Sequence, residues 1–150
     1  ALHWGYSLLA GAMTLVIMIL PLIIRTTEEA LMGVPDAYRE ASFGLGAGKL
    51  RTVFKVVLPS AIPGILSGVV LATGRIVGET AALIYTAGSV AKVPSSLMGS
   101  GRTLAVHMYV LASEGLYMKQ AYATAVILVL IVIAINALSS RLAKQLMKGK

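Results

Sequence analysis

Three long apolar stretches constrain this chain more than any other feature of its sequence. They run from about residue 8 to 24, from 61 to 85 and from 121 to 138. Each approaches the roughly 20 residues that a helix needs to cross a bilayer. The sequence therefore predicts an all-α membrane protein with three transmembrane helices.

The composition supports a membrane location and excludes several other classes of protein. Apolar residues make up 57% of the chain and charged residues only 13%, against roughly 25% charged residues in soluble domains. The chain has no cysteine and only two histidines, so it can assemble no metal cluster and no cysteine nucleophile. The net charge of +7 lies on the loops, where it reports orientation, and we expect no nucleic-acid partner.

The distribution of Lys and Arg predicts how the chain lies in the membrane. The segment 25–60 and the tail after residue 138 hold nine of them: Arg25, Arg39, Lys49, Arg51, Lys55, Arg141, Lys144, Lys148 and Lys150. The residues before the first span hold none, and the segment between the second and third spans holds Lys92, Arg102 and Lys119. By the positive-inside rule, the loop 25–60 and the C-terminus are cytoplasmic, whereas the N-terminus and the loop 86–118 are outside.

The tail also indicates contact with membrane lipid. Leucines recur there at four-residue steps beside the basic residues, at Leu138, Leu142 and Leu146. An apolar stripe flanked by cations is typical of a helix end that rests on anionic lipid headgroups.

Two charged residues, Arg75 and Glu79, lie inside the second apolar stretch. An ionised side chain in hydrocarbon is costly, so such residues usually face a protein interior or a water-filled path. On a helical wheel the two share a face with Gly64 and Gly68, which predicts that this face packs against protein. A guanidinium suits an oxyanion, and a carboxylate four residues later can moderate its charge. The alternative is a structural ion pair that only fixes helix packing, and the residues alone leave both open.

The loop 25–60 carries a motif of fixed spacing. Its residues are Glu40, Ala41 and Ser42, then Gly46, then Val56, Leu58 and Pro59. The pattern resembles the cytoplasmic signature of ABC importer permease subunits, Glu-Ala-Ala followed by Gly and by Ile-x-Leu-Pro, with Ser42 and Val56 as conservative departures. In that family the segment docks on the ATPase subunits, so the resemblance implies that Glu40, Ala41, Ser42, Gly46, Leu58 and Pro59 are coupling residues. The alternative is an ordinary amphipathic surface loop.

Local signals in this loop predict a helix, a turn and a second short helix. Pro35 suits the first turn of a helix, and Asp36 and Glu40 place acidic charge near its start. The glycine-rich run 44–48 breaks this helix, and we expect the second helix to end near Pro59.

The glycine-rich run is not a phosphate-binding loop. Phe43 stands where the first glycine of such a loop belongs, and Leu50 follows Lys49 where a Ser or Thr is needed. We therefore expect no cofactor in this chain, with ATP and Mg bound by partner ATPase subunits.

The segment Gly74-Arg75-x-x-Gly78-Glu79-Thr80 is similar to permease subunits for inorganic phosphate. The resemblance implies that Arg75, Glu79 and Thr80 line the substrate pathway and that the chain is not itself an enzyme. It also implies a companion permease subunit, two ATP-binding subunits and an external phosphate-binding protein, in the cytoplasmic (inner) membrane of a prokaryote. The alternatives are the same architecture importing molybdate or sulfate, and a membrane scaffold or sensor that transports nothing.

The start of the chain, Ala-Leu-His-Trp, has neither an initiator methionine nor the charge pattern of a signal peptide. Three spans can hardly enclose a pathway. We therefore expect residues 1–150 to be the C-terminal part of one type I ABC importer permease domain, which the resemblance implies has roughly six spans when complete.

Overall fold

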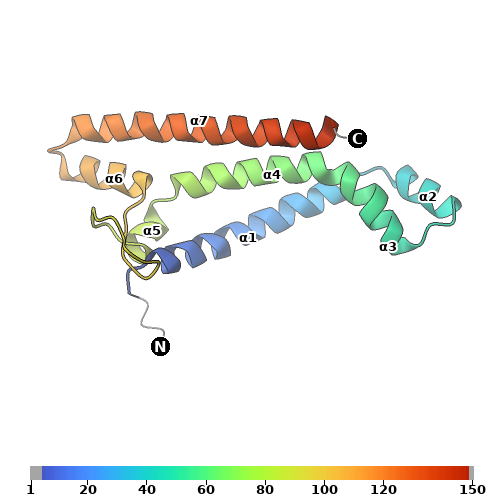
Figure 1. The fold of residues 1–150 in the computed structure, drawn as a ribbon, viewed down its shortest axis with the longest axis horizontal. Coiled ribbons are helices and arrows are strands. Elements are labelled where there is room, and N and C mark those ends of the chain that lie inside the picture. Colours follow the sequence, from blue (N-terminus) through green and yellow to red (C-terminus); the bar gives the residue numbers. More distant parts are fainter. Residues whose placement is uncertain (1–4, 149–150) are drawn as a thin grey trace. The chain divides into compact units, whose positions relative to one another are not determined.

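The computed structural model describes residues 5–148, except for the side chains of residues 142–144 and 146–148. The described residues form helices and no strands, which confirms the predicted all-α fold. In chain order the elements are α1 (Leu8–Met32), α2 (Asp36–Gly44), α3 (Lys49–Thr52), the π-helical turn η1 (Val53–Val57), α4 (Leu58–Gly78), α5 (Ala81–Thr86), α6 (Leu104–Glu114) and α7 (Met118–Lys148) (Figure 1). The predicted lipid contact of the tail rests on Leu142 and Leu146, whose side chains lie outside the described residues.

Three helical segments of the described chain are long and apolar enough to cross a membrane. They are Leu8–Met32, Lys49–Gly78 and Met118–Arg141, in agreement with the three predicted spans. Only 11%, 22% and 11% of their most apolar windows is buried within the chain. Most of this apolar surface is therefore left for lipid or for other subunits.

The second apolar stretch is not one helix, and the expectation of a continuous helix over 61–85 is wrong. Helix α4 ends at Gly78 and α5 begins at Ala81. Thr80 leaves helical geometry, with φ −122° and ψ −52°. The charged end of this stretch therefore lies at a break between two helices.

The helix also begins earlier than expected. The predicted second short helix does not end near Pro59, because α3, η1 and α4 follow one another as a single helical segment from Lys49 to Gly78. In η1 the Leu58 N–H donates to the Val53 carbonyl, five residues back. This wider turn directly precedes Pro59, which has no N–H to donate and disfavours a regular α-helical turn.

The described chain divides into two compact units. The first contains Ala1–Ile19 and Thr73–Ala137, and the second contains Leu20–Ala72 and Leu138–Lys150. In the first unit, Leu83, Ala87 and Val106 are buried together, which joins α5 to α6. A Cβ atom on Gly11 would lie 2.9 Å from the Ala87 Cβ atom, so α1 approaches the end of α5 closely.

In the second unit, α1 packs on the small-residue face of α4. Val34, Val57 and Ala61 form its buried cluster. A Cβ atom on Gly64 would lie 2.7 Å from the Ala30 Cβ atom. Small residues at this spacing permit close approach of membrane helices, so this part of the predicted face does pack against protein.

Candidate functional site

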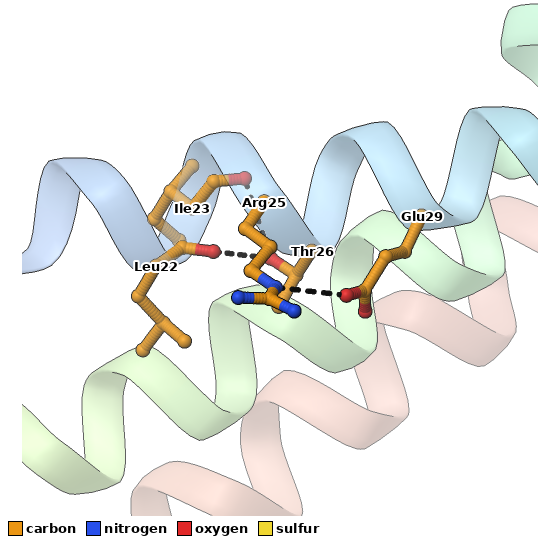
Figure 2. Close-up of polar contacts among 5 residues, drawn as sticks. All are labelled: Leu22, Ile23, Arg25, Thr26 and Glu29. Carbon is orange, nitrogen blue, oxygen red and sulfur yellow. Dashed lines mark hydrogen bonds and ion pairs between the residues drawn. The ribbon is translucent and has the colours of Figure 1, made fainter.

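Arg75 lies in the last turn of α4 and is exposed in this chain. The ion pairs within the described residues are Arg25 with Glu29, at 3.1 Å (Figure 2), and Arg39 with Asp36, at 2.6 Å. An ion pair between Arg75 and Glu79, one of the two alternatives that the sequence left open, is not among them. The five N–H donors of the Arg75 guanidinium are therefore not used by the described part of the chain.

Glu79 instead stabilises the helix break. Its Oε1 atom accepts a hydrogen bond from the Ala82 N–H group at 3.1 Å. The first N–H groups of a helix have no intrahelical partner, and a carboxylate is a favourable acceptor for them. Glu79 directly follows the last residue of α4, and its carboxylate is turned to the start of α5.

Thr80 also forms a hydrogen bond within the break between α4 and α5. Its Oγ1 atom donates to the Gly78 carbonyl at 3.3 Å, and the residue occupies the position just before α5. The structure thus places Arg75, Glu79 and Thr80 in one short segment that ends one apolar helix and starts another. Their role in a substrate pathway stays a prediction.

The motif of the loop 25–60 lies on α2 and on the turn that follows it. Glu40 and Ala41 are exposed on α2. Gly46 has φ +78°, and the two hydrogen bonds around it run from its own N–H to the Phe43 carbonyl and from the Ala47 N–H to the Ser42 carbonyl. This is a Schellman ending, in which the left-handed residue is usually glycine. Gly46 is therefore needed for its backbone conformation and not for space, because nothing lies within 4 Å of where a Cβ atom on it would stand.

Ser42 joins α2 to α3. Its Oγ atom lies 2.8 Å from the Thr52 Oγ1 atom, and Thr52 is 1% exposed. Leu58 and Pro59, the last residues of the motif, are half-buried at the start of α4. The motif residues therefore split into an exposed group on α2 and an inward group that joins α2 to the helix after it.

Several exposed apolar side chains around the motif were missed by the sequence reading. Leu45 is 89% exposed, Leu50 77% and Phe54 62%. They lie on the turn after α2, on α3 and on η1, beside the exposed residues Lys49 and Arg51. Large apolar side chains at this exposure indicate a binding surface for another protein. The sequence could have revealed this surface, because its bulky apolar residues lie within a loop that is otherwise basic.

The described residues hold no group of three or more His, Cys, Asp or Glu side chains suited to a metal ion. The candidate site therefore has two parts. One is the cationic helix break around Arg75, and the other is the exposed surface of α2 and α3.

Residues 1–149 match the family of binding-protein-dependent transport system inner membrane components. The chain belongs to this permease family. With its three apolar helices, this permease is a multi-pass membrane protein. No solved structure gives a significant match to it.

Named relatives of the permease are bacterial. It is 38% identical over 126 residues to the probable ABC transporter permease protein YqgI of Bacillus subtilis (strain 168), a match that covers 75% of this chain and 43% of the relative. It is 47% identical over 85 residues to the phosphate transport system permease protein PstA 2 of Mycobacterium bovis, which covers 57% of this chain and 28% of the relative. The permease thus spans less than half the length of these curated relatives.

Proposed function

We propose that this permease contributes half of the membrane pathway of an ATP-driven importer of inorganic phosphate. Relatives that are 44–47% identical over 85–88 residues carry names of phosphate transport permeases. The three apolar helices and the match to a permease family support a subunit of a membrane pathway.

The observation that carries the proposal is the state of Arg75. It is a permanently charged side chain on an apolar helix, and no carboxylate of the described residues pairs with it. A guanidinium presents a planar fork of donors that matches the oxygens of a phosphate group. An arginine kept free of internal partners beside a helix break is suited to contact an anion that passes.

Phosphate must also leave the site, because conduction requires binding that is strong enough to admit an anion and weak enough to release it. Glu79 and Thr80 follow Arg75 closely in the sequence. We propose that both line the same path, where the negative charge of Glu79 limits the retention of a bound anion. Its hydrogen bond to Ala82 holds that carboxylate in place.

Coupling is assigned to the other part of the candidate site. Two partner subunits bind ATP and Mg²⁺ and dock on the exposed surface of α2 and α3, with Glu40, Ala41 and Gly46 at its centre. A companion permease subunit completes the pathway, and an external phosphate-binding protein meets the segment 86–118. In this arrangement the N-terminus lies outside and the C-terminus is cytoplasmic in the inner membrane of a prokaryote, as the charge distribution favours.

The test is uptake of ³²P-labelled phosphate by vesicles that contain the complete complex, with ATP inside the compartment that represents the cytoplasm. We expect ATP-dependent accumulation that unlabelled phosphate suppresses and that equal concentrations of molybdate or sulfate leave largely unchanged. Suppression by molybdate or sulfate with little effect of phosphate would assign another oxyanion. ATP hydrolysis without accumulation of any of the three anions would support a membrane scaffold instead.

A further inference from the structure

The Arg39 side chain connects two helices. Its Nη1 atom donates to the Val34 carbonyl at 2.8 Å and to the Asp36 Oδ1 atom at 2.6 Å, and its Nη2 atom donates to the Leu31 carbonyl at 2.9 Å. Leu31 belongs to the last turn of α1, whereas Arg39 belongs to α2. The last carbonyl groups of a helix lack an intrahelical donor, and here the guanidinium supplements the 3.4 Å bond that the Leu31 carbonyl accepts from the Val34 N–H.

The linker between these helices has little freedom of its own. Only Gly33, Val34 and Pro35 separate α1 from α2. Val34 is 5% exposed and packs with Val57 and Ala61, and the proline ring fixes one backbone torsion. The linker is therefore anchored to the core of the second unit, and the Arg39 hydrogen bonds cross it.

Most of the Arg39 side chain is covered by its own chain. Its side chain is 28% exposed, against 84% for Asp36 beside it. By contrast, the partner surface defined above consists of side chains that are mostly exposed. The guanidinium points its donors inward, toward carbonyl groups of its own chain.

We propose that Arg39 is the positioning residue that transmits movement of α2 to α1. The inference rests on the proposed function, since it takes α2 as the segment on which the ATPase subunits dock. A displacement of α2 on ATP binding then pulls on the end of α1 through the guanidinium. Without the Arg39 hydrogen bonds, α2 moves with the ATPase subunits and α1 moves less.

Arginine is required because its rigid fork reaches acceptors in different directions at once. A lysine keeps the charge but concentrates its donors on one flexible ammonium group. Arg39→Lys is therefore expected to restore little of the coupling. The matched control is Arg25→Gln, because Arg25 is 80% exposed and bonds Glu29 within α1 only (Figure 2).

The first measurement is the distance between α1 and α2 in the assembled complex, with spin labels on Leu20→Cys and Ala37→Cys. The chain has no cysteine, so it presents no other thiol to the label. We expect a narrow distance distribution with Arg39 or with Arg25→Gln, and a clearly broader one with Arg39→Gln and Arg39→Lys. An equally narrow distribution in both Arg39 variants would overturn the inference. This readout does not depend on which anion is carried.

The second measurement is the number of phosphate ions moved per ATP hydrolysed in vesicles. Arg39→Gln removes the guanidinium that makes three hydrogen bonds, so we expect a clearly lower ratio for this variant. The ATPase subunits should still co-purify, and Arg25→Gln should keep the normal ratio. An unchanged ratio would contradict the role, and so would loss of co-purification of the ATPase subunits, which would assign Arg39 to docking instead. Absence of uptake with the native residues would count against the proposed function, while the distance measurement still decides the role of Arg39.

Discussion

Gly68 of α4 lies so close to Thr26 of α1 that a Cβ atom on the glycine would overlap the Thr26 Oγ1 atom and stand 2.7 Å from the Thr26 Cβ atom. Thr26 turns its hydroxyl back onto its own helix, where Oγ1 donates to the Leu22 carbonyl at 3.0 Å (Figure 2). The contact therefore joins two helices without a polar bond between them. Its stability comes from close packing of small groups.

Gly68→Ala is expected to lower the stability of the complex. The added methyl group overpacks the contact with Thr26, which typically costs about 1–3 kcal/mol. Thermal unfolding of the purified complex in detergent measures the loss. Gly74→Ala is the control, because nothing lies within 4 Å of a Cβ atom at that glycine of the same helix. Adding Thr26→Gly to Gly68→Ala should recover part of the lost stability. Equal stability of the Gly68→Ala and Gly74→Ala complexes would contradict the packing.

Gly46→Ala is expected to weaken docking of the ATPase subunits. At φ +78°, an alanine carries a strain of about 1–2 kcal/mol, so the turn between α2 and α3 would change shape. Co-purification of the ATPase subunits with the permease measures the effect. Gly48→Ala is the matched control, since Gly48 has φ −74° and open space around it. If the Gly46→Ala and Gly48→Ala variants retained the ATPase subunits equally, the left-handed backbone of Gly46 would not be needed for docking.

Ser42→Ala is expected to destabilise the junction of α2 and α3, although it restores the residue usual in the signature. The buried Thr52 hydroxyl would lose its partner at 2.8 Å, which costs about 1–3 kcal/mol. Combining it with Thr52→Val removes both polar groups and should be nearly neutral. A double-mutant cycle read by thermal unfolding gives the coupling energy. Strictly additive effects would show that the two hydroxyls do not interact.

Glu79→Gln is expected to keep the helix break, because the amide oxygen can still accept the Ala82 N–H group. Glu79→Ala removes the acceptor and should cost about 1 kcal/mol. Thermal unfolding separates the two variants. If limiting anion retention is the role of the charge, Glu79→Gln should also bind phosphate more tightly and transport it more slowly than the native chain. Unchanged stability of Glu79→Ala would mean that the carboxylate does not cap α5.

The sequence predicted the features that depend on length and spacing. The apolar stretches are long enough to identify the spans, and the spacing from Glu40 to Pro59 places the motif on α2 and the following helix. The break after Gly78 could not be predicted in this way, because apolar residues resume at Ala81 and run to Tyr85. It depends on a side-chain cap that hydropathy does not report.

Two other features could not be predicted from the sequence, for related reasons. Pro59 is normally a helix terminator, but the wider turn of η1 lets the helix continue through it. Arg39 appeared only as one more positive charge on a cytoplasmic loop. Its bond to Leu31 joins residues eight apart across the linker between α1 and α2, and a linear pattern does not show which carbonyl groups a long side chain reaches.

Uptake of labelled phosphate by vesicles that carry Arg75→Ala tests the proposed pathway most directly. Arg141→Ala serves as the control, because it removes an exposed arginine from another apolar helix. We predict that Arg75→Ala abolishes ATP-dependent phosphate accumulation while the complex still assembles, and that Arg141→Ala transports normally. Normal accumulation by the Arg75→Ala complex would contradict the assignment of this guanidinium to the phosphate path.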